Sequence, residues 1–222
     1  QGQTRSFRVV DTDPVAVARG NAAGLARDFL LILDDPAVSD VTLVVEGREI
    51  RAHRAILAAR CPHFKSMLTS GMRESWDATI PLEDIAYAPF YAMLRFLYSG
   101  EAHLEPQLAI EVLNLADRFL LPGLKRTCEA VLVPAIAMGS VVALLLAADR
   151  VEAHLLLDAA LVFITKHFCE VLSLEEYQSL DARLMLRVQK AIAPYVRTEG
   201  FDLKPHPSVE SEDMHPRCRR RI

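Results

Sequence analysis

The chain has 222 residues, of which 51% are hydrophobic and 24% are charged. This mixture is typical of a globular protein with enough apolar side chains for a core, and it excludes disorder over the whole length. The formal net charge of -4 at pH 7 argues against a surface that coats nucleic acid, so we expect no nucleic-acid partner.

The four cysteines of the chain lie far apart and form no C-x-x-C pair: they are Cys61, Cys128, Cys169 and Cys218. This spacing predicts neither a disulfide framework nor a structural zinc site. Residues 1–20 carry several charges and no apolar block, so the sequence predicts no secretory signal. We therefore expect a reducing compartment, namely the cytoplasm, the nucleus or both.

The first predicted helix follows a segment of mixed charge, residues 1–20, which we interpret as a linker or the tail of an upstream part. From about residue 24 onward, Leu25, Phe29 and Leu33 recur every four positions. Such spacing places the three side chains on one stripe of a helix. An Asp-Asp-Pro run then ends the helix, because the residue before proline avoids the helical conformation.

A predicted β-hairpin comes next, over residues 41–52, where apolar and polar side chains alternate. Gly47 lies between the two strands, where a tight turn requires a residue that tolerates positive φ. Two short helices follow the hairpin. The first ends before Pro62, and the second carries Phe64 and Leu68 on one face.

The predicted elements then alternate between short strands and helices. Residues 79–82 and residues 101–104 are each predicted as a short strand. Between them, the helix opened by Pro89 is apolar on nearly every side, so it must be buried on nearly all faces. Two further helices are predicted over residues 106–119 and 124–133.

The remaining elements are predicted to be helical throughout. Ser173 and Glu176 match a capping box that would open one short helix, and Asp181 would cap the last one.

The uncharged run at residues 130–148 approaches the length of a membrane span. A proline, a glycine and a serine interrupt this run, so we expect no membrane span.

Several short motifs in the middle of the chain resemble those of the BTB/POZ family, and their order and spacing match over roughly residues 24–133. The motifs are Ser39-Asp40-Val41-Thr42-Leu43, Ala52 to Arg60, Pro62-His63-Phe64, Phe96 to Gly100, Leu115-Ala116-Asp117 and Leu121 to Cys128. Residues 138–196 look like the helical BACK region that often follows a BTB domain. Within them, residues 140–168 are similar to the helix pair called the 3-box in cullin adaptors.

The resemblance implies an α+β fold class: a BTB/POZ helical cluster with a small flanking sheet, followed by an all-α BACK-like extension. Four segments are then expected: 1–20, a linker or upstream tail; 21–135, the BTB/POZ domain; 136–196, the BACK-like helical region; and 197–222, a disordered tail. The tail is assigned because it is polar, contains three prolines and has no apolar stripe.

The resemblance also implies a function in protein interaction. BTB proteins form homodimers, and many of them bind cullin-3 to recruit substrates for ubiquitination. We therefore expect an adaptor whose partners are a second copy of the chain, cullin-3 and an unidentified protein substrate. The alternative is an oligomerisation scaffold, for example in transcriptional regulation, without attachment to a ligase.

Two sets of site residues are implied for the expected partners. The cullin-binding signature of the family is a hydrophobic residue, any residue and a glutamate, and Met72-Arg73-Glu74 fits it. Met72 would be a flexible apolar anchor, and Glu74 would bind backbone amides or a cation on the partner. For the dimer interface, the stripe of Leu25, Phe29 and Leu33 corresponds to the N-terminal dimerisation helix of the family.

A third implied site is the charged pair at the floor of the BTB dimer groove, to which Asp40 and Arg54 correspond. A buried ion pair tends to specify geometry more than it adds stability. We expect a structural role for this pair rather than peptide binding. The neighbouring His53 is expected to be a hydrogen-bonded core residue.

Enzymatic chemistry has little support in the sequence. The chain lacks a G-x-S-x-G elbow, a G-x-x-x-x-G-K-[ST] loop and an H-E-x-x-H helix. Cys61 lies near His63, and His167 lies near Cys169, but neither pair has further metal ligands close by in the sequence. We expect no catalytic residues, no metal and no cofactor.

Overall fold

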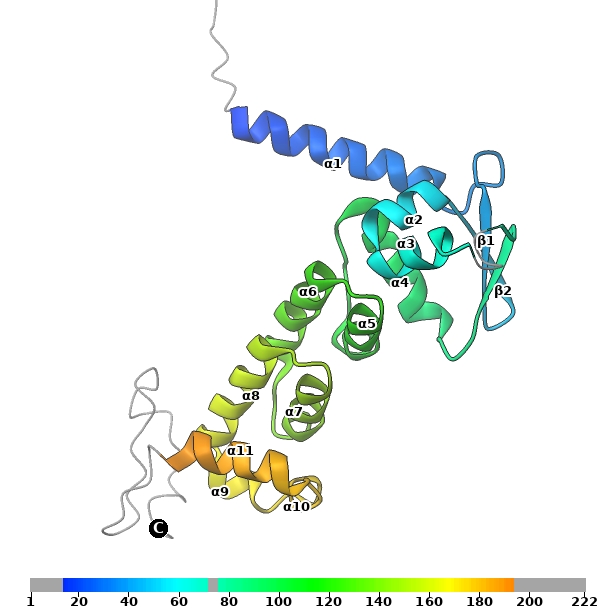
Figure 1. The fold of residues 1–222 in the computed structure, drawn as a ribbon. Helices are drawn as coiled ribbons and strands as arrows, with labels where there is room; N and C mark the ends of the chain where they lie inside the picture. Colours follow the sequence, from blue (N-terminus) through cyan, green and yellow to red (C-terminus); the bar gives the residue numbers. More distant parts are fainter. Residues whose placement is uncertain (1–13, 72–75, 194–222) are drawn as a thin grey trace, which may run out of the picture. The chain divides into compact units, whose positions relative to one another are not determined.

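A computed structural model describes residues 14–71 and 76–193, with side chains from residue 20 onward (Figure 1). The chain divides into two compact units, one through Ala102 and one from His103. This boundary lies inside the segment 21–135, for which the sequence predicts a single domain.

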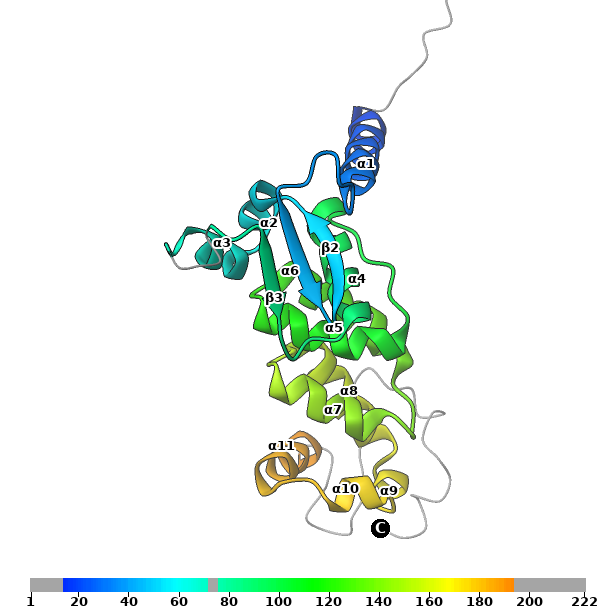
Figure 2. The same ribbon diagram turned by 90° about the vertical axis from the view of Figure 1, so that its right-hand side faces the viewer.

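In its described residues, 14–71 and 76–102, the first unit contains a three-stranded sheet and four helices. Its elements are α1 (Pro14–Ile32), β1 (Val41–Val45), β2 (Arg48–Ala52), α2 (Arg54–Arg60), α3 (Pro62–Thr69), β3 (Thr79–Leu82) and α4 (Tyr87–Ser99). The strand order is β2-β1-β3, so β1 is the central strand, as Figure 2 shows. β2 is antiparallel to β1, whereas β3 is parallel to it.

The predicted hairpin is confirmed as β1 and β2. Val45 pairs with Arg48, so the turn consists of Glu46 and Gly47 alone. Their φ values are 50° and 73°, and two positive φ values in succession match the twist of a two-residue hairpin. The alternation of buried and exposed side chains along β2 follows from the same register.

The core of the first unit lies between the sheet and the helices. α4 is buried along most of its length, as its apolar composition predicts. Phe64 of α3 meets Phe90 of α4 edge to face, with ring centroids 6.5 Å apart. α4 also packs against α1 and α2. These contacts hold α1 to the unit through α4, and they determine which side chains of α1 remain open.

One helix start and one strand differ from the predictions. α1 begins at Pro14, ten residues before the predicted start, so residues 14–20 are helical rather than a linker. Proline suits the first turn of a helix. The residues that follow it lack an apolar stripe, so the sequence pattern did not predict them as helical. The predicted strand at 101–104 is absent. The Ser99 hydroxyl instead binds both the amide and the carbonyl of Glu101, at 3.1 and 3.0 Å.

The second unit is helical in the part of it that the structure describes. Its elements are α5 (Pro106–Arg118), α6 (Pro122–Leu132), a 3-10 turn η2 (Val133–Ala135), α7 (Val141–Arg150), α8 (His154–Lys166), α9 (Phe168–Val171), α10 (Glu175–Gln178) and α11 (Ala182–Ile192). α5 packs on α6, and α7 packs on α8; the pairs meet through α6 with α8 and through α5 with α7. The predicted α+β class, with its helical extension, is thus confirmed.

The last helix, α11, is capped as predicted and tied to α7. The Asp181 carboxylate accepts a hydrogen bond from the Leu184 amide at 2.7 Å. On α7, Asp149 binds Arg183 and Arg187, which lie one turn apart on α11. The predicted capping box is wrong, because the Ser173 hydroxyl donates backward to the Cys169 carbonyl at 3.4 Å.

Within residues 14–71 and 76–193, no helix combines the length and the apolar character that crossing a membrane requires. The uncharged run at 130–148 is divided among the end of α6, the turn η2 and the start of α7.

Candidate protein-interaction site

The stripe of α1 that was predicted as a dimer interface is open at one end and buried at the other. Leu25 is 58% exposed and Phe29 is 37% exposed, whereas Leu33, which follows the end of α1 at Ile32, is 8% exposed and packs inside its own unit. An exposed leucine and phenylalanine four residues apart form a continuous apolar surface on a helix. Leu25 and Phe29 are therefore the members of the stripe that another molecule could cover.

A hollow of about 260 Å³ adjoins this open stripe. It lies among α1, α2 and α4 and is lined by Phe29, Ala55, Ile56, Ala59, Arg60, Leu97 and Tyr98. Most of these side chains are apolar, and Arg60 is turned toward α4, where its Nε donates to the Leu97 carbonyl at 3.1 Å. An apolar side chain of a partner would fit this hollow without leaving a charged group unpaired.

Beside the hollow, Tyr98 is hydrogen-bonded to His53; the expected hydrogen bond is present, although this histidine is half-buried rather than in the core. The Tyr98 hydroxyl oxygen accepts from the His53 backbone amide at 2.9 Å and lies 2.9 Å from its Nδ1. Burial raises the pKa of Tyr98 to about 12; the hydrogen bond from His53 opposes this shift, and the charge of Asp40 adds to it. The phenol therefore stays protonated and fixes the start of α2.

Asp40 and Arg54 meet, but through the backbone of Arg54. The Asp40 carboxylate accepts from the Arg54 amide at 2.7 Å, at the first turn of α2, where a negative charge is favourable. Asp40 is exposed rather than buried in the single chain. The Arg54 guanidinium donates to the backbone carbonyl of Asp77, so it reaches the segment that leads into β3.

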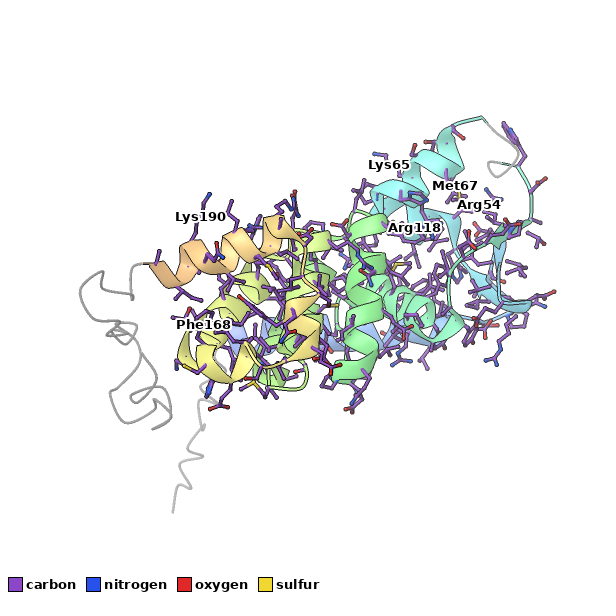
Figure 3. All side chains as sticks on the ribbon, turned by 90° about the horizontal axis from the view of Figure 1, so that it is seen from below. Arg54, Lys65, Met67, Arg118, Phe168 and Lys190 are labelled. Atoms are coloured by element: carbon purple, nitrogen blue, oxygen red, sulfur yellow. The ribbon has the colours of Figure 1, made fainter. Side chains whose placement is uncertain are left out.

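That segment carries the single tryptophan of the chain, Trp76, which is 81% exposed. The predicted cullin-binding residues Met72 and Glu74 lie outside the residues that the structure describes. Figure 3 shows Arg54 on α2 and, on the neighbouring helix α3, Lys65 and Met67. The described residues closest in sequence to the predicted motif are thus Gly71 and Trp76.

In the second unit, α6 holds the turn between α7 and α8 with two opposite charges. The Glu129 carboxylate is 4% exposed and accepts from the amides of Leu155 and Leu156 at 3.0 and 3.4 Å. One turn earlier, the Lys125 ammonium donates to the Val151 carbonyl at the end of α7. The anion thus faces a helix N-terminus and the cation faces a helix C-terminus, which are the favourable arrangements.

The buried thiols of Cys61 and Cys128 are not activated. Burial is the main cause that raises the pKa of the Cys61 thiol, although two backbone hydrogen bonds oppose it. Burial likewise raises the pKa of Cys128 to about 12, with the charge of Glu129 adding to the shift. A nucleophilic cysteine needs the opposite shift. Among the residues described, no His, Cys, Asp and Glu side chains gather in a group that could hold a metal ion.

Three residues of these sites were not predicted from the sequence: Lys125, Glu129 and Trp76. Lys125 and Glu129 are ordinary surface types on a helix, and no local pattern tells which helix ends they meet. Trp76 had a usable signal, because a lone tryptophan in a polar stretch between two elements is unusual. Its exposure, however, depends on the surrounding fold.

Comparison with known proteins assigns part of this chain to a family. Residues 32–135 match the family model for the BTB/POZ domain. This range covers most of the first unit and extends into the second as far as η2.

Relatives with similar sequences carry the same domain. The chain is 33% identical over 192 residues to the mouse (Mus musculus) TD and POZ domain-containing protein 3, covering 86% of this chain and 53% of that protein. It is 30% identical over 168 residues to the human (Homo sapiens) Kelch repeat and BTB domain-containing protein 4, covering 75% of this chain and 32% of that protein. The chain thus spans about half the length of the first relative and about a third of the second.

Among solved structures, the BTB domain of human Gigaxonin is similar to this chain. The two are 27% identical, with a TM-score of 0.43, over 58% of this chain and 97% of that domain.

Proposed function

Because residues 32–135 form a BTB/POZ domain, a protein-interaction module, we propose that this chain is a homodimeric adaptor that docks cullin-3 and positions a protein substrate for ubiquitination. The chain would act by surface complementarity rather than by chemistry on a substrate. A few buried anchors would then supply most of the binding free energy.

The exposed stripe of α1, formed by Leu25 and Phe29, supports the proposal that the chain forms a homodimer. Leu25 and Phe29 are large apolar side chains that remain exposed on α1, a helix that contacts its own unit through α4. A second copy of the chain would bury both, with its own stripe meeting the first as the two-fold symmetry of a homodimer requires. Each buried side chain of this size contributes roughly 1.5–3 kcal/mol.

The cullin-3 part of the proposal is supported by sequence likeness. Met72 and Glu74 match the cullin-binding signature that the family resemblance implies. One relative of this chain is a Kelch repeat and BTB domain-containing protein, a kind of protein in which the domain accompanies a separate repeat region. A dimer would offer two cullin sites, and such bivalence raises avidity without any new contact.

Binding to the cullin-3 N-terminal domain tests the proposal directly. The purified chain is mixed with that domain, and the mass of the eluting species is measured by size exclusion with light scattering. We expect co-elution, which Met72→Asp abolishes and the matched variant Met72→Leu retains, since leucine keeps an apolar anchor. If the wild-type chain elutes as a dimer without cullin-3, the adaptor proposal is wrong and the scaffold alternative is favoured.

The BACK-like helices would extend the cullin contact. α7 and α8 follow the BTB/POZ domain directly and correspond to the segment that resembles a 3-box. They expose Leu146 and Leu155. Replacing Leu155 by aspartate should weaken cullin-3 binding and leave the dimer mass unchanged; an unchanged dissociation constant would limit the contact to the BTB/POZ domain.

A further inference from the structure

Trp76 is displayed on the surface of the first unit rather than packed into it. It is 81% exposed, although tryptophan buries more apolar area on contact than any other residue type. It is also the single tryptophan in the chain. An exposed tryptophan contributes little to the fold that carries it, so its placement must be explained by something other than core packing.

The backbone next to Trp76 is held firmly although the side chain is free of the core. The carbonyl of Asp77 accepts from the Arg54 guanidinium. The carbonyl of the following residue, Ala78, accepts from the Thr42 amide of β1 at 2.8 Å. Arg54 is itself fixed through its amide by the Asp40 carboxylate at 2.7 Å. Hydrogen bonds thus hold the backbone carbonyls of the two residues that directly follow Trp76.

A large aromatic side chain on a fixed backbone has the properties of a binding anchor. Tryptophan is enriched among the residues that dominate protein interfaces, because it supplies contact area at a low cost in conformational entropy. A fixed backbone lowers that cost further, since less freedom is lost on binding. The position between α3 and β3 also lies four residues after Met72, which the proposed function assigns to the cullin contact.

We propose that Trp76 is an anchor residue for the partner protein and that Arg54 is the residue that positions it. The occupant of this site is the cullin-3 N-terminal domain, which would offer an apolar pocket for the indole and a cation for the exposed Asp77 carboxylate beside it. This inference rests on the proposed function. It assigns to Arg54 a role in orienting a partner-binding loop.

A fluorine label tests the contact without interference from other tryptophans. The chain is produced with 5-fluorotryptophan, so that its single tryptophan gives one fluorine resonance, and unlabelled cullin-3 N-terminal domain is added. We expect the resonance to shift as the complex forms. Co-elution of the two proteins with an unchanged resonance would overturn the role of Trp76 and leave the adaptor function standing, whereas a lack of any co-elution would overturn both.

Affinity measurements on matched variants supply a second readout. Trp76→Ala should weaken cullin-3 binding by about 10- to 30-fold, as expected for an interface anchor. Trp76→Phe should retain most of the affinity. The control is Val38→Ala, which trims another exposed apolar side chain of the same unit and should leave the dissociation constant unchanged. Equal affinities for wild type and Trp76→Ala would refute the proposal.

The positioning role of Arg54 is tested by a double-mutant cycle. Arg54→Gln should weaken binding about 3- to 10-fold in the wild-type background and have almost no effect in the Trp76→Ala background, because it acts through the indole. The dimer mass should stay the same in all four proteins. If Arg54→Gln lowers the affinity equally in both backgrounds, the two residues are independent and the positioning role is wrong.

Discussion

At the scale of single residues, the buried phenol of Tyr98 makes stability depend on pH. Burial raises its pKa from 10.0 to about 12. Between these two pH values the unfolded chain releases the phenol proton and the folded chain keeps it. The folded state then binds more protons, so the free energy of unfolding falls as the pH rises from about 10 to about 12.

Chemical denaturation at a series of pH values checks this expectation with Tyr98→Phe. That variant should lose this part of the alkaline decline. It should also be about 1–3 kcal/mol less stable at neutral pH, since the His53 amide loses its acceptor. Tyr91→Phe, on the same helix, should keep the decline. Parallel curves for wild type and Tyr98→Phe above pH 10 would contradict the assignment.

The side chains that sequence reasoning found are those with a periodic signal. Leu25 and Phe29 share a stripe because their spacing is helical, whereas their exposure depends on how α1 packs on α4. The family resemblance implied Asp40 and Arg54 as a charged pair, but the contact of the Asp40 carboxylate with the Arg54 amide could not be predicted. That geometry depends on where α2 begins, which is set by tertiary packing.

At the scale of elements, α6 and the turn between α7 and α8 form one electrostatic arrangement. Glu129→Ala should destabilise the second unit by about 1–3 kcal/mol, because one part-buried and one buried amide lose their acceptor. Glu129→Gln should cost less, because the amide oxygen still accepts and only the charge at the helix N-terminus is lost.

Hydrogen exchange at Leu155 and Leu156 measures this effect where it arises. Exchange at both amides should be faster in Glu129→Ala than in the wild type. The control is Glu111→Ala on the exposed face of α5, which should change stability by less than about 0.5 kcal/mol. Unchanged exchange at these two amides would show that other acceptors replace the carboxylate.

The prediction of elements succeeded where a local pattern determines the outcome. The turn at Gly47 and the cap at Asp181 depend on a few adjacent residues, and both are confirmed. The strand at 101–104 and the capping box at Ser173 failed. In both cases a serine hydroxyl binds a nearby backbone carbonyl, an alternative that serine offers locally and that competes with regular structure.

At the scale of the whole molecule, the open stripe of α1 predicts the oligomeric state. Phe29→Asp should convert a dimer into a species with the chain mass of 24.7 kDa, because a carboxylate would be buried without a partner in the interface. Leu31→Asp is the matched control, since Leu31 is also exposed but lies on a different side of the helix.

Sedimentation equilibrium distinguishes the two variants. Leu31→Asp should remain a dimer over the concentration range in which Phe29→Asp is monomeric. Circular dichroism of both variants shows whether either loses helix. A wild-type chain that sediments as a monomer, or two variants with the same mass, would remove α1 from the interface.

The parallel pairing of β3 with β1 has a consequence for the order of folding. β1 and β2 close over two residues, whereas both α2 and α3 lie between β1 and β3. Closing the longer loop costs more chain entropy, so we expect β3 to join the sheet after the transition state. Ile80→Val should then accelerate unfolding, whereas Ile50→Val in the hairpin should slow refolding. Stopped-flow chevron plots separate the two, and a slowed refolding arm for Ile80→Val would place β3 in the nucleus.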